Sequence, residues 1–197
     1  MGTMKLIAAT HNPNKAREIK RILKYRYEIL TLEEAGITES IPEPWDTLEE
    51  NAYQKSSVIY SITNANCFGE DTGLEVTALD GRPGVKTARY AGENATAEMN
   101  LAKLLDALKD KDDRDARFRT IISLIVNGEE YRFEGVCEGK ISKEKSGENG
   151  FGYDPVFIPN GSEKTFAEMG DSEKDKFSHR RKALEKMGSF LEKFEFH

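Results

Sequence analysis

The sequence predicts an α/β fold in which a central mixed sheet, partly antiparallel, is flanked by helices. Short apolar segments typical of buried strands alternate along the chain with longer segments whose apolar residues recur at helical spacing. The pair Asn127-Gly128 separates a β-branched segment, 118–126, from a segment of alternating residues. Because Asn-Gly between two strand-like segments is typical of a tight hairpin, at least one pair of strands is expected to be antiparallel.

The first part of the chain is expected to alternate between strands and helices. Ile19, Ile22 and Leu23 recur at helical spacing after a turn-forming segment. Thr47 and Glu50 have the spacing of a capping box, which predicts that a helix begins at residue 48. The expected elements are a strand 5–10, the helix that contains Ile19, a strand 27–30, a helix 48–62 and a strand 65–69.

The second part of the chain is expected to contain two long helices and the hairpin. Thr96 is expected to cap a helix, because Leu101, Leu104 and Leu108 recur on one face after it. The almost entirely charged segment 109–115 is typical of a solvated loop. The expected elements are a strand 74–79 closed by a turn 80–84, the helix capped by Thr96, the strand 118–126 with its hairpin partner, and a last helix 178–194.

Length and composition favour one domain over residues 1–197, with two lobes. The chain has 38% hydrophobic and 32% charged residues and a net charge of -6, values that are ordinary for a globular protein. A net acidic chain would repel a long nucleic-acid backbone, so we expect no nucleic-acid partner. No apolar segment approaches the ~20 residues of a membrane span, and the amino terminus lacks a signal-peptide pattern. We therefore expect no membrane partner and a cytoplasmic location.

The adjacent carboxylates Glu70 and Asp71 indicate a metal-dependent site. They are expected where two strands meet, and carboxylate oxygens are the hard ligands that Mg²⁺ prefers. Lys15 lies at a strand-to-helix junction, the place where α/β proteins tend to bind phosphates. Lys55 adds a second cation from the expected helix 48–62. This combination is what a magnesium-dependent enzyme acting on a nucleotide would need.

Three further residue patterns have an ordinary structural explanation beside the functional one. Phe151 and Tyr153 follow a glycine-rich segment, 146–150, which indicates either backbone packed around a flat ligand or core residues of a strand. Glu43 lies between two prolines, as either a metal ligand or a solvated loop residue. His179 is either a site residue or simply the start of a helix. The residue types alone leave these alternatives open.

Six segments, taken together, resemble the noncanonical purine nucleoside triphosphate pyrophosphatases, the inosine triphosphatase or Ham1-like family. They are residues 10–15, 49–52, 70–74, 83–90, 151–155 and 178–180. The resemblance implies an elongated α/β fold with a nucleotide cleft between two lobes, and usually a homodimer. It also implies magnesium-dependent hydrolysis of inosine, deoxyinosine or xanthosine triphosphate to the monophosphate and pyrophosphate, which removes deaminated purines from the nucleotide pool.

The resemblance also implies roles for individual residues. Asp71 is similar to the family's general base and magnesium ligand, and Glu43 and Glu70 are similar to further metal-binding carboxylates. Lys55 is expected to assist catalysis by compensating charge. The residues expected at the phosphates are Thr10, Asn12, Lys15, Lys55 and Thr72. Those expected at the base are the stacking residue Phe151, its neighbours Gly152 and Tyr153, and the edge-reading Asp154, Lys174, His179 and Arg180.

Two alternatives remain open from the sequence. A house-cleaning pyrophosphatase of the Maf type would prefer modified pyrimidine or methylated guanine nucleotides. A nucleotide-binding module that hydrolyses nothing would have no need of a buried base beside a metal. Replacement of Asp71 would distinguish an enzyme from a binding module, because in an enzyme it should abolish turnover while leaving nucleotide binding.

Overall fold

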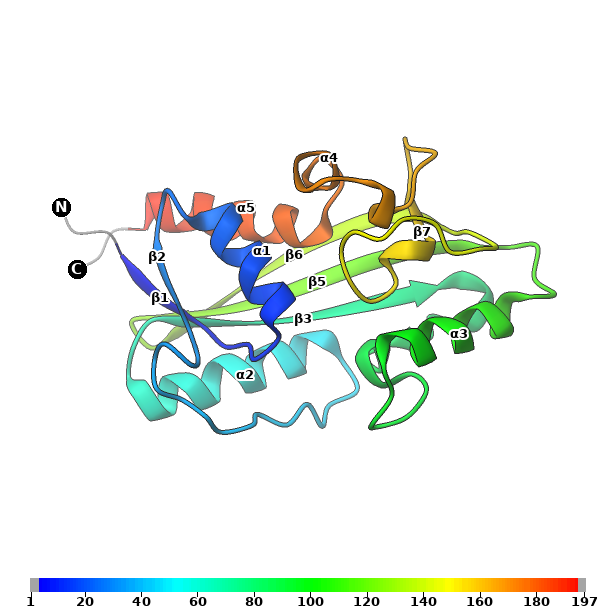
Figure 1. Ribbon diagram of the computed structural model, residues 1–197. Helices are drawn as coiled ribbons and strands as arrows, with labels where there is room; N and C mark the ends of the chain where they lie inside the picture. Colours follow the sequence, from blue (N-terminus) through cyan, green and yellow to red (C-terminus); the bar gives the residue numbers. More distant parts are fainter. Residues whose placement is uncertain (1–3, 195–197) are drawn as a thin grey trace. The chain divides into compact units, whose positions relative to one another are not determined.

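A mixed sheet of seven strands runs through the part of the chain that the computed structural model describes, residues 4–194 (Figure 1). The strands are β1 (Lys5–Ala8), β2 (Glu28–Thr31), β3 (Cys67–Val76), β4 (Pro83–Gly84), β5 (Asp115–Val126), β6 (Glu129–Ile141) and β7 (Phe157–Pro159). Their order is β2-β1-β3-β5-β6-β7, with β4 paired to β3. β1 is parallel to β2 and β3, whereas β4 is antiparallel to β3 and β7 is antiparallel to β6. The predicted mixed sheet is confirmed.

Helices are inserted between the strands and follow the last of them. The α-helices are α1 (Pro13–Leu23), α2 (Leu48–Thr63), α3 (Ala97–Leu108), α4 (Asp171–Asp175) and α5 (His179–Lys193). The short 3-10 helices are η1 (Thr77–Leu79), η2 (Thr87–Arg89), η3 (Asp154–Val156) and η4 (Phe166–Glu168). The alternation of strands and helices in the first half confirms the predicted α/β class.

The chain divides into two compact units, each with its own hydrophobic core. The first unit contains the residues up to Asp71, the segment Thr120–Gly135 and the residues from Arg180 onward. The second contains Thr72–Arg119 and Val136–His179. The strands β3, β5 and β6 supply residues to both units. A single two-lobed domain with a nucleotide cleft stays a prediction.

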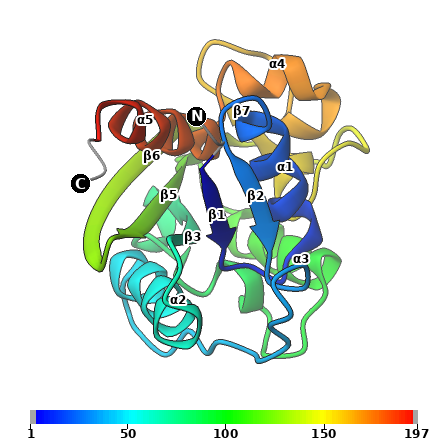
Figure 2. The same cartoon turned by 90° about the vertical axis from the view of Figure 1, so that its left-hand side faces the viewer.

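In the first unit, the two faces of β1 pack against different helices. Leu6 and Ala8 belong to a buried cluster with residues of α1 and α5. Ile7 and Ala9 belong to another cluster, which includes Ile59 of α2. Figure 2 shows α1 and α5 on one side of β1 and α2 on the other. Because successive strand residues face opposite sides, helices on both faces explain why β1 is apolar throughout.

Side-chain caps fix where the first two helices begin. Asn12 Oδ1 accepts hydrogen bonds from backbone N–H groups in the first turn of α1. Thr47 Oγ1 accepts one from the N–H of Glu50, and the Glu50 carboxylate accepts one from the Thr47 hydroxyl. The predicted start of α2 is therefore confirmed. β1 ends at Ala8 rather than Thr10, because the N–H of Thr10 turns back to the carbonyl of Ala8.

The prediction that Glu70 and Asp71 lie where two strands meet is wrong. Both residues lie in the middle of β3, which continues without a break past them. The preceding glycine, Gly69, serves a close approach rather than a turn. A Cβ at Gly69 would lie 2.4 Å from the carbonyl oxygen of Ala52, so the glycine lets α2 pack directly on the strand.

In the second unit, α3 covers a core formed with the strand ends and the segments around β7. Leu101, Leu104 and Leu108 are buried in this core, as their spacing predicts. Thr96 Oγ1 accepts a hydrogen bond from the N–H of Met99 at 3.2 Å, which confirms the predicted cap. Residues 77–79, predicted as the end of a strand, instead form η1.

The hairpin between β5 and β6 has the predicted turn. Asn127 and Gly128 have φ angles of 53° and 85°, the positive values that a type I′ turn requires at both central positions. β5 begins at Asp115, three residues before the predicted strand, so it takes in the end of the charged segment. α5 begins within one residue of its predicted start.

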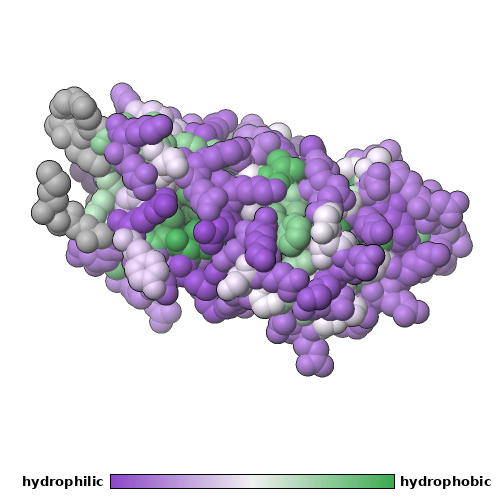
Figure 3. Space-filling model, turned by 90° about the horizontal axis from the view of Figure 1, so that it is seen from above, coloured by the Kyte–Doolittle hydropathy of each residue, from purple (hydrophilic) through white to green (hydrophobic). Residues whose placement is uncertain are grey.

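The surface that Figure 3 shows is mostly hydrophilic. Hydrophobic side chains form small patches on it, separated by hydrophilic ones. This agrees with a chain in which 32% of the residues are charged. Across residues 4–194, the helices all fall short of the length and apolar character needed to cross a membrane.

Candidate active site

Glu70 and Asp71 are adjacent and buried in β3, but they face different helices. Phe68, two residues before Glu70, packs in the cluster of α1 and α5. Cys67 packs in the cluster of α2, and Gly69, two residues before Asp71, contacts that helix directly. Because strand residues alternate between faces, Glu70 points toward α1 and α5, and Asp71 points toward α2. The ion pairs that each carboxylate forms are therefore different.

Glu70 lies in a buried group of ion pairs formed by β3, α1 and α5. Its carboxylate accepts a hydrogen bond from Arg180 Nε at 3.1 Å and lies 3.0 Å from Lys15 Nζ. Arg180 Nη1 also donates to Glu18 Oε2 at 2.5 Å. Burial alone would raise the pKa of Glu70, but Arg180 and Lys15 outweigh it and hold this pKa well below its usual range. Glu70 is therefore an anion held between two cations.

Asp71 lies beside Lys55 and Glu43. Lys55 Nζ is 3.6 Å from Asp71 Oδ1, forms an ion pair with Glu43 Oε1, and donates to the backbone carbonyl of Glu70 at 2.9 Å. Burial raises the pKa of Asp71, although Lys55 and Lys15 act against the shift. Burial would lower the pKa of Lys55, but Asp71 and Glu43 reverse this and raise it. The result is a carboxylate with increased proton affinity beside a stable cation, as a general base requires.

The loop between β1 and α1 presents a helix N-terminus next to Lys15. Thr10 Oγ1 accepts a hydrogen bond from the N–H of Asn12 at 3.1 Å. Asn12 Oδ1 accepts hydrogen bonds from the N–H groups of Asn14 at 3.0 Å and Lys15 at 3.2 Å. Anions are stabilised at helix N-termini by the helix dipole and the N–H groups. The structure thus brings the predicted Thr10, Asn12 and Lys15 together in a place suited to phosphate.

The oxygens around Lys55 fit a divalent metal ion better than those around Glu70. Glu43 and Asp71 both form ion pairs with the ammonium group of Lys55, so one cation already has two carboxylate partners. Such hard oxygen donors suit Mg²⁺. Glu70 would have to exchange Arg180 and Lys15 before it could bind a metal. In the described part of the chain, no three His, Cys, Asp or Glu side chains are arranged to hold an ion.

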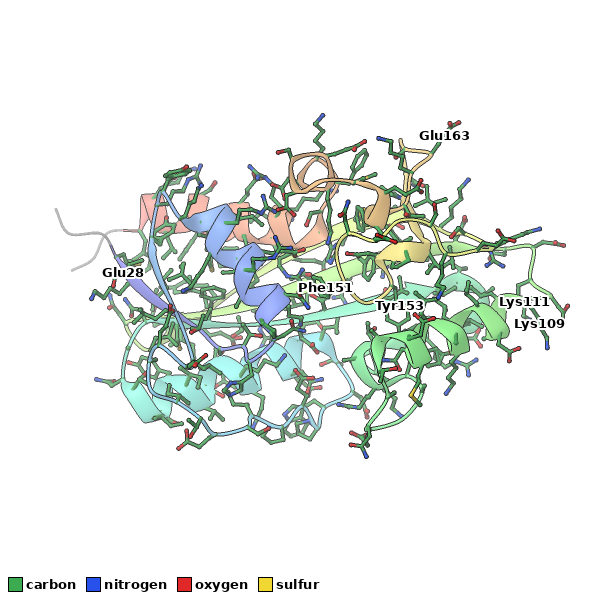
Figure 4. The ribbon with its side chains drawn as sticks, in the orientation of Figure 1. Glu28, Lys109, Lys111, Phe151, Tyr153 and Glu163 are labelled. Atoms are coloured by element: carbon green, nitrogen blue, oxygen red, sulfur yellow. The ribbon has the colours of Figure 1, made fainter. Side chains whose placement is uncertain are left out.

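In the second unit, Asp154 connects Phe151 to Lys174. Asp154 Oδ2 accepts hydrogen bonds from Lys174 Nζ at 2.8 Å and from the N–H of Phe151 at 3.0 Å. Lys174 Nζ lies 5.2 Å from the centre of the Phe151 ring, within cation–π range. Gly150 has a φ of 74°, and a Cβ there would lie 2.0 Å from Asp154 Oδ2. Phe151, labelled in Figure 4, is only half-buried, as is Gly152.

Tyr153 and His179 are buried by specific contacts within the second unit. The Tyr153 hydroxyl donates to the carbonyl of Thr87 at 2.7 Å, and burial raises the pKa of Tyr153 above its usual range. The His179 ring stacks on Phe118, with centroids 4.7 Å apart and planes 15° apart. Phe166 lies on the same histidine at 6.4 Å. Phe118 and Phe166 were not predicted as neighbours of the site, and no spacing in the sequence connects them to His179.

Arg180 forms ion pairs with carboxylates. It belongs to the first unit, where it bonds Glu70 and Glu18. Its predicted role toward the purine stays a prediction, as does the phosphate role of the half-buried Thr72. Glu18 was not predicted as a site residue. Its position three residues after Lys15 and directly before Ile19, at the edge of the core face of α1, could have indicated that it lies near Lys15.

Comparisons with known proteins cover nearly the whole chain. A model of the Ham1 family matches residues 6–190. The dITP/XTP pyrophosphatase of Christiangramia forsetii is 50% identical over 190 residues, which span 96% of this chain and 100% of that protein. That of Bacillus subtilis is 46% identical, over 94% of this chain and 96% of that protein. A HAM1 protein structure from Coxiella burnetii matches with a TM-score of 0.89 at 34% identity, over 98% of this chain and 100% of that one.

Proposed function

Because the chain belongs to the Ham1 family, we propose that it hydrolyses noncanonical purine nucleoside triphosphates such as ITP, dITP and XTP to the monophosphate and pyrophosphate. Its relatives of 46% to 50% identity are dITP/XTP pyrophosphatases. The observation in this chain that carries the proposal is the buried Asp71 beside Lys55, with Lys15 and a helix N-terminus in the same unit. Its role would be to remove deaminated purines from the nucleotide pool.

The charges around Glu70 and Asp71 support Mg²⁺ as the cofactor. Cations and carboxylates are paired closely here, with Lys15, Lys55 and Arg180 against Glu18, Glu43, Glu70 and Asp71. These carboxylates would repel a triphosphate, and a divalent cation would offset that repulsion. Glu43 and Asp71 would hold the ion, which would supply stabilisation of charge on the phosphoryl oxygens.

The residues of the first unit have different proposed roles at the phosphates. Asp71 would take a proton from the attacking water, since its carboxylate is buried beside Lys55. Lys55 compensates the negative charge beside it. Lys15 and the N-terminus of α1 hold the phosphate chain, together with Thr10 and Asn12. Pyrophosphate leaves from the same surroundings, where Lys15 and Lys55 would offset part of its charge.

The residues of the second unit supply the features that a purine needs. Phe151 has a half-buried ring on which a base can stack. Lys174 and His179 provide donors, and the buried Asp154 fixes the loop that carries Phe151. Inosine and xanthosine have a 6-oxo acceptor where adenine has an amino donor. A buried donor at this position would favour them by about tenfold to a hundredfold.

Three wider features belong to the same proposal and are supported by the family assignment. The chain forms one domain with two lobes. The protein is a homodimer. It works in the cytoplasm, where the nucleotide pool is found.

The test is pyrophosphate release from a panel of triphosphates. We expect ITP, dITP and XTP to be cleaved with added Mg²⁺ and to stay intact when a chelator replaces it, while ATP, GTP, CTP and TTP are poor substrates. Preference for modified pyrimidines or methylated guanine would favour a Maf-type enzyme instead. Tight nucleotide binding without release of any phosphate would indicate a binding module.

A further inference from the structure

Glu43 lies in a segment that has neither helix nor strand. Residues 41–45 are irregular in the structure, and prolines stand on both sides of Glu43. The segment precedes α2, and the Glu43 carboxylate forms an ion pair with Lys55, the eighth residue of that helix. A carboxylate on an irregular segment needs a second attachment if it is to stay in one position.

Asn51 provides such an attachment. Its side chain is completely buried, at 0% exposure, in the second turn of α2. Asn51 Nδ2 donates to the carbonyl of Trp45 at 3.0 Å, and Asn51 Oδ1 accepts from the N–H of Trp45 at 3.0 Å. One side-chain amide therefore satisfies both backbone groups of a residue two positions after Glu43. Lys55 lies four residues after Asn51, on the same face of the helix.

We infer that Asn51 is a positioning residue, which holds segment 41–45 against α2 and thereby keeps the Glu43 carboxylate beside Lys55 and Asp71. The inference rests on the proposed function, because its consequence for catalysis assumes that Glu43 and Asp71 hold Mg²⁺. Its structural part needs only the two hydrogen bonds to Trp45. Without them, Glu43 loses its fixed position while the sheet and the rest of α2 remain.

The second unit contains a matched attachment in α3. Asn100 stands four residues after the cap Thr96, as Asn51 does after Thr47. Asn100 Nδ2 donates to the carbonyl of Ala88 at 3.0 Å, and Asn100 Oδ1 accepts from the N–H of Ala91 at 2.8 Å. Both asparagines are buried and both attach a preceding loop to a helix. Asn100→Ala is therefore a control for the loss of a buried amide at another place in the fold.

Trp45 makes the attachment measurable without any substrate. It is the only tryptophan in the chain, and 47% of its surface is exposed. In Asn51→Ala we expect acrylamide to quench Trp45 fluorescence about twice as strongly as in the wild type, because two hydrogen bonds to its backbone are lost. Asn51→Asp keeps the acceptor and nearly the same volume, but replaces the donor by a buried carboxylate oxygen that faces the Trp45 carbonyl. It should therefore give a change in the same direction that is at least as large.

A second experiment titrates Mg²⁺, first without substrate by Trp45 fluorescence and then by activity on dITP. The Mg²⁺ concentration that half-saturates the Trp45 fluorescence change should rise about tenfold in Asn51→Ala, as should the concentration for half-maximal activity. Turnover at saturating Mg²⁺ should recover most of the wild-type value. Gln54→Ala removes only the 3.4 Å contact to the Trp45 indole and should leave both Mg²⁺ values unchanged. Asn100→Ala should lower the melting temperature but leave Trp45 quenching unchanged.

Each result decides the inference. Increased quenching with an unchanged Mg²⁺ requirement would overturn it, since the segment would then be released without consequence for Glu43. A lower melting temperature with unchanged quenching would also overturn it and leave Asn51 a purely structural residue. If the wild type cleaves no triphosphate, the proposed function fails; unchanged quenching would then overturn the attachment as well, and increased quenching would uphold it.

Discussion

The two units of the protein use buried polar residues in different ways. In the first unit, several ion pairs are linked to one another around Glu70 and Asp71. In the second, Lys174 and Asp154 pair with each other beside aromatic rings. Linked ion pairs can exchange partners with an added metal ion or phosphate, whereas a pair among aromatic rings mainly fixes a shape. This difference agrees with the proposal that the first unit acts on the phosphates and the second binds the base.

The largest expected effect is on turnover, in the first unit. Asp71→Asn removes the proton acceptor and should lower turnover of dITP about a thousandfold. Binding of dITP, measured by isothermal titration calorimetry, should change much less, because the lysines and aromatic residues remain. Comparable losses of turnover and binding would contradict the catalytic role proposed for the first unit, since Asp71 would then be a binding residue.

The next effect is on stability, in the second unit. Lys174→Met leaves the buried Asp154 carboxylate without the neighbouring ammonium group and should lower the free energy of unfolding by about 3 kcal/mol. Urea denaturation measures this loss. The double variant Lys174→Met/Asp154→Asn should recover part of it, because the buried negative charge is removed as well. Absence of recovery would show that the pair does more than balance charge.

A smaller effect separates base recognition from phosphate recognition. Phe151→Ala removes the predicted stacking surface and should raise the KM for dITP about tenfold, with little change in kcat. Tripolyphosphate has no base, so its inhibition constant should be the same for Phe151→Ala and the wild type. An equal loss of affinity for dITP and tripolyphosphate would place Phe151 at the phosphates.

The smallest expected effect is a change in how stability depends on pH. Arg180 and Lys15 overcome burial and hold the pKa of Glu70 below the ordinary value of 4.5, so ionised Glu70 stabilises the fold above that pH. This stabilisation is lost as the pH falls through the folded pKa. Melting temperatures of Glu70→Gln should therefore fall less steeply than those of the wild type on acidification below about pH 4. Parallel curves would mean that other carboxylates dominate acid unfolding.

Local signals in the sequence predicted the elements whose cause is local. The caps Thr47 and Thr96 and the turn Asn127-Gly128 act within a few residues of themselves, and all three are confirmed. The continuity of β3 could not be predicted, because Gly69 is needed by a helix packed across it and not by the strand itself. A glycine required by a neighbour looks, in the sequence, the same as a glycine required by a turn.

The candidate site could be predicted as a set of residues but not as an arrangement. The resemblance named Glu70, Asp71 and Arg180, yet the pleat of a continuous strand turns the two carboxylates toward different helices. The pairing of Arg180 with Glu18 joins residues 162 positions apart, which no spacing rule connects. Such pairings arise from packing of distant segments and appear only in the folded chain.

The ion pairs made by Lys15, Lys55 and Arg180 also determine which anions can compete for the site in a cell. Each cation already has a carboxylate partner, so inorganic phosphate or a stretch of RNA must displace that partner and gains little free energy by doing so. A triphosphate that carries its own divalent cation gives the released carboxylates a new partner. Under the proposed function, the resting protein would therefore favour triphosphates that carry their own divalent cation over other phosphates, before any base is recognised.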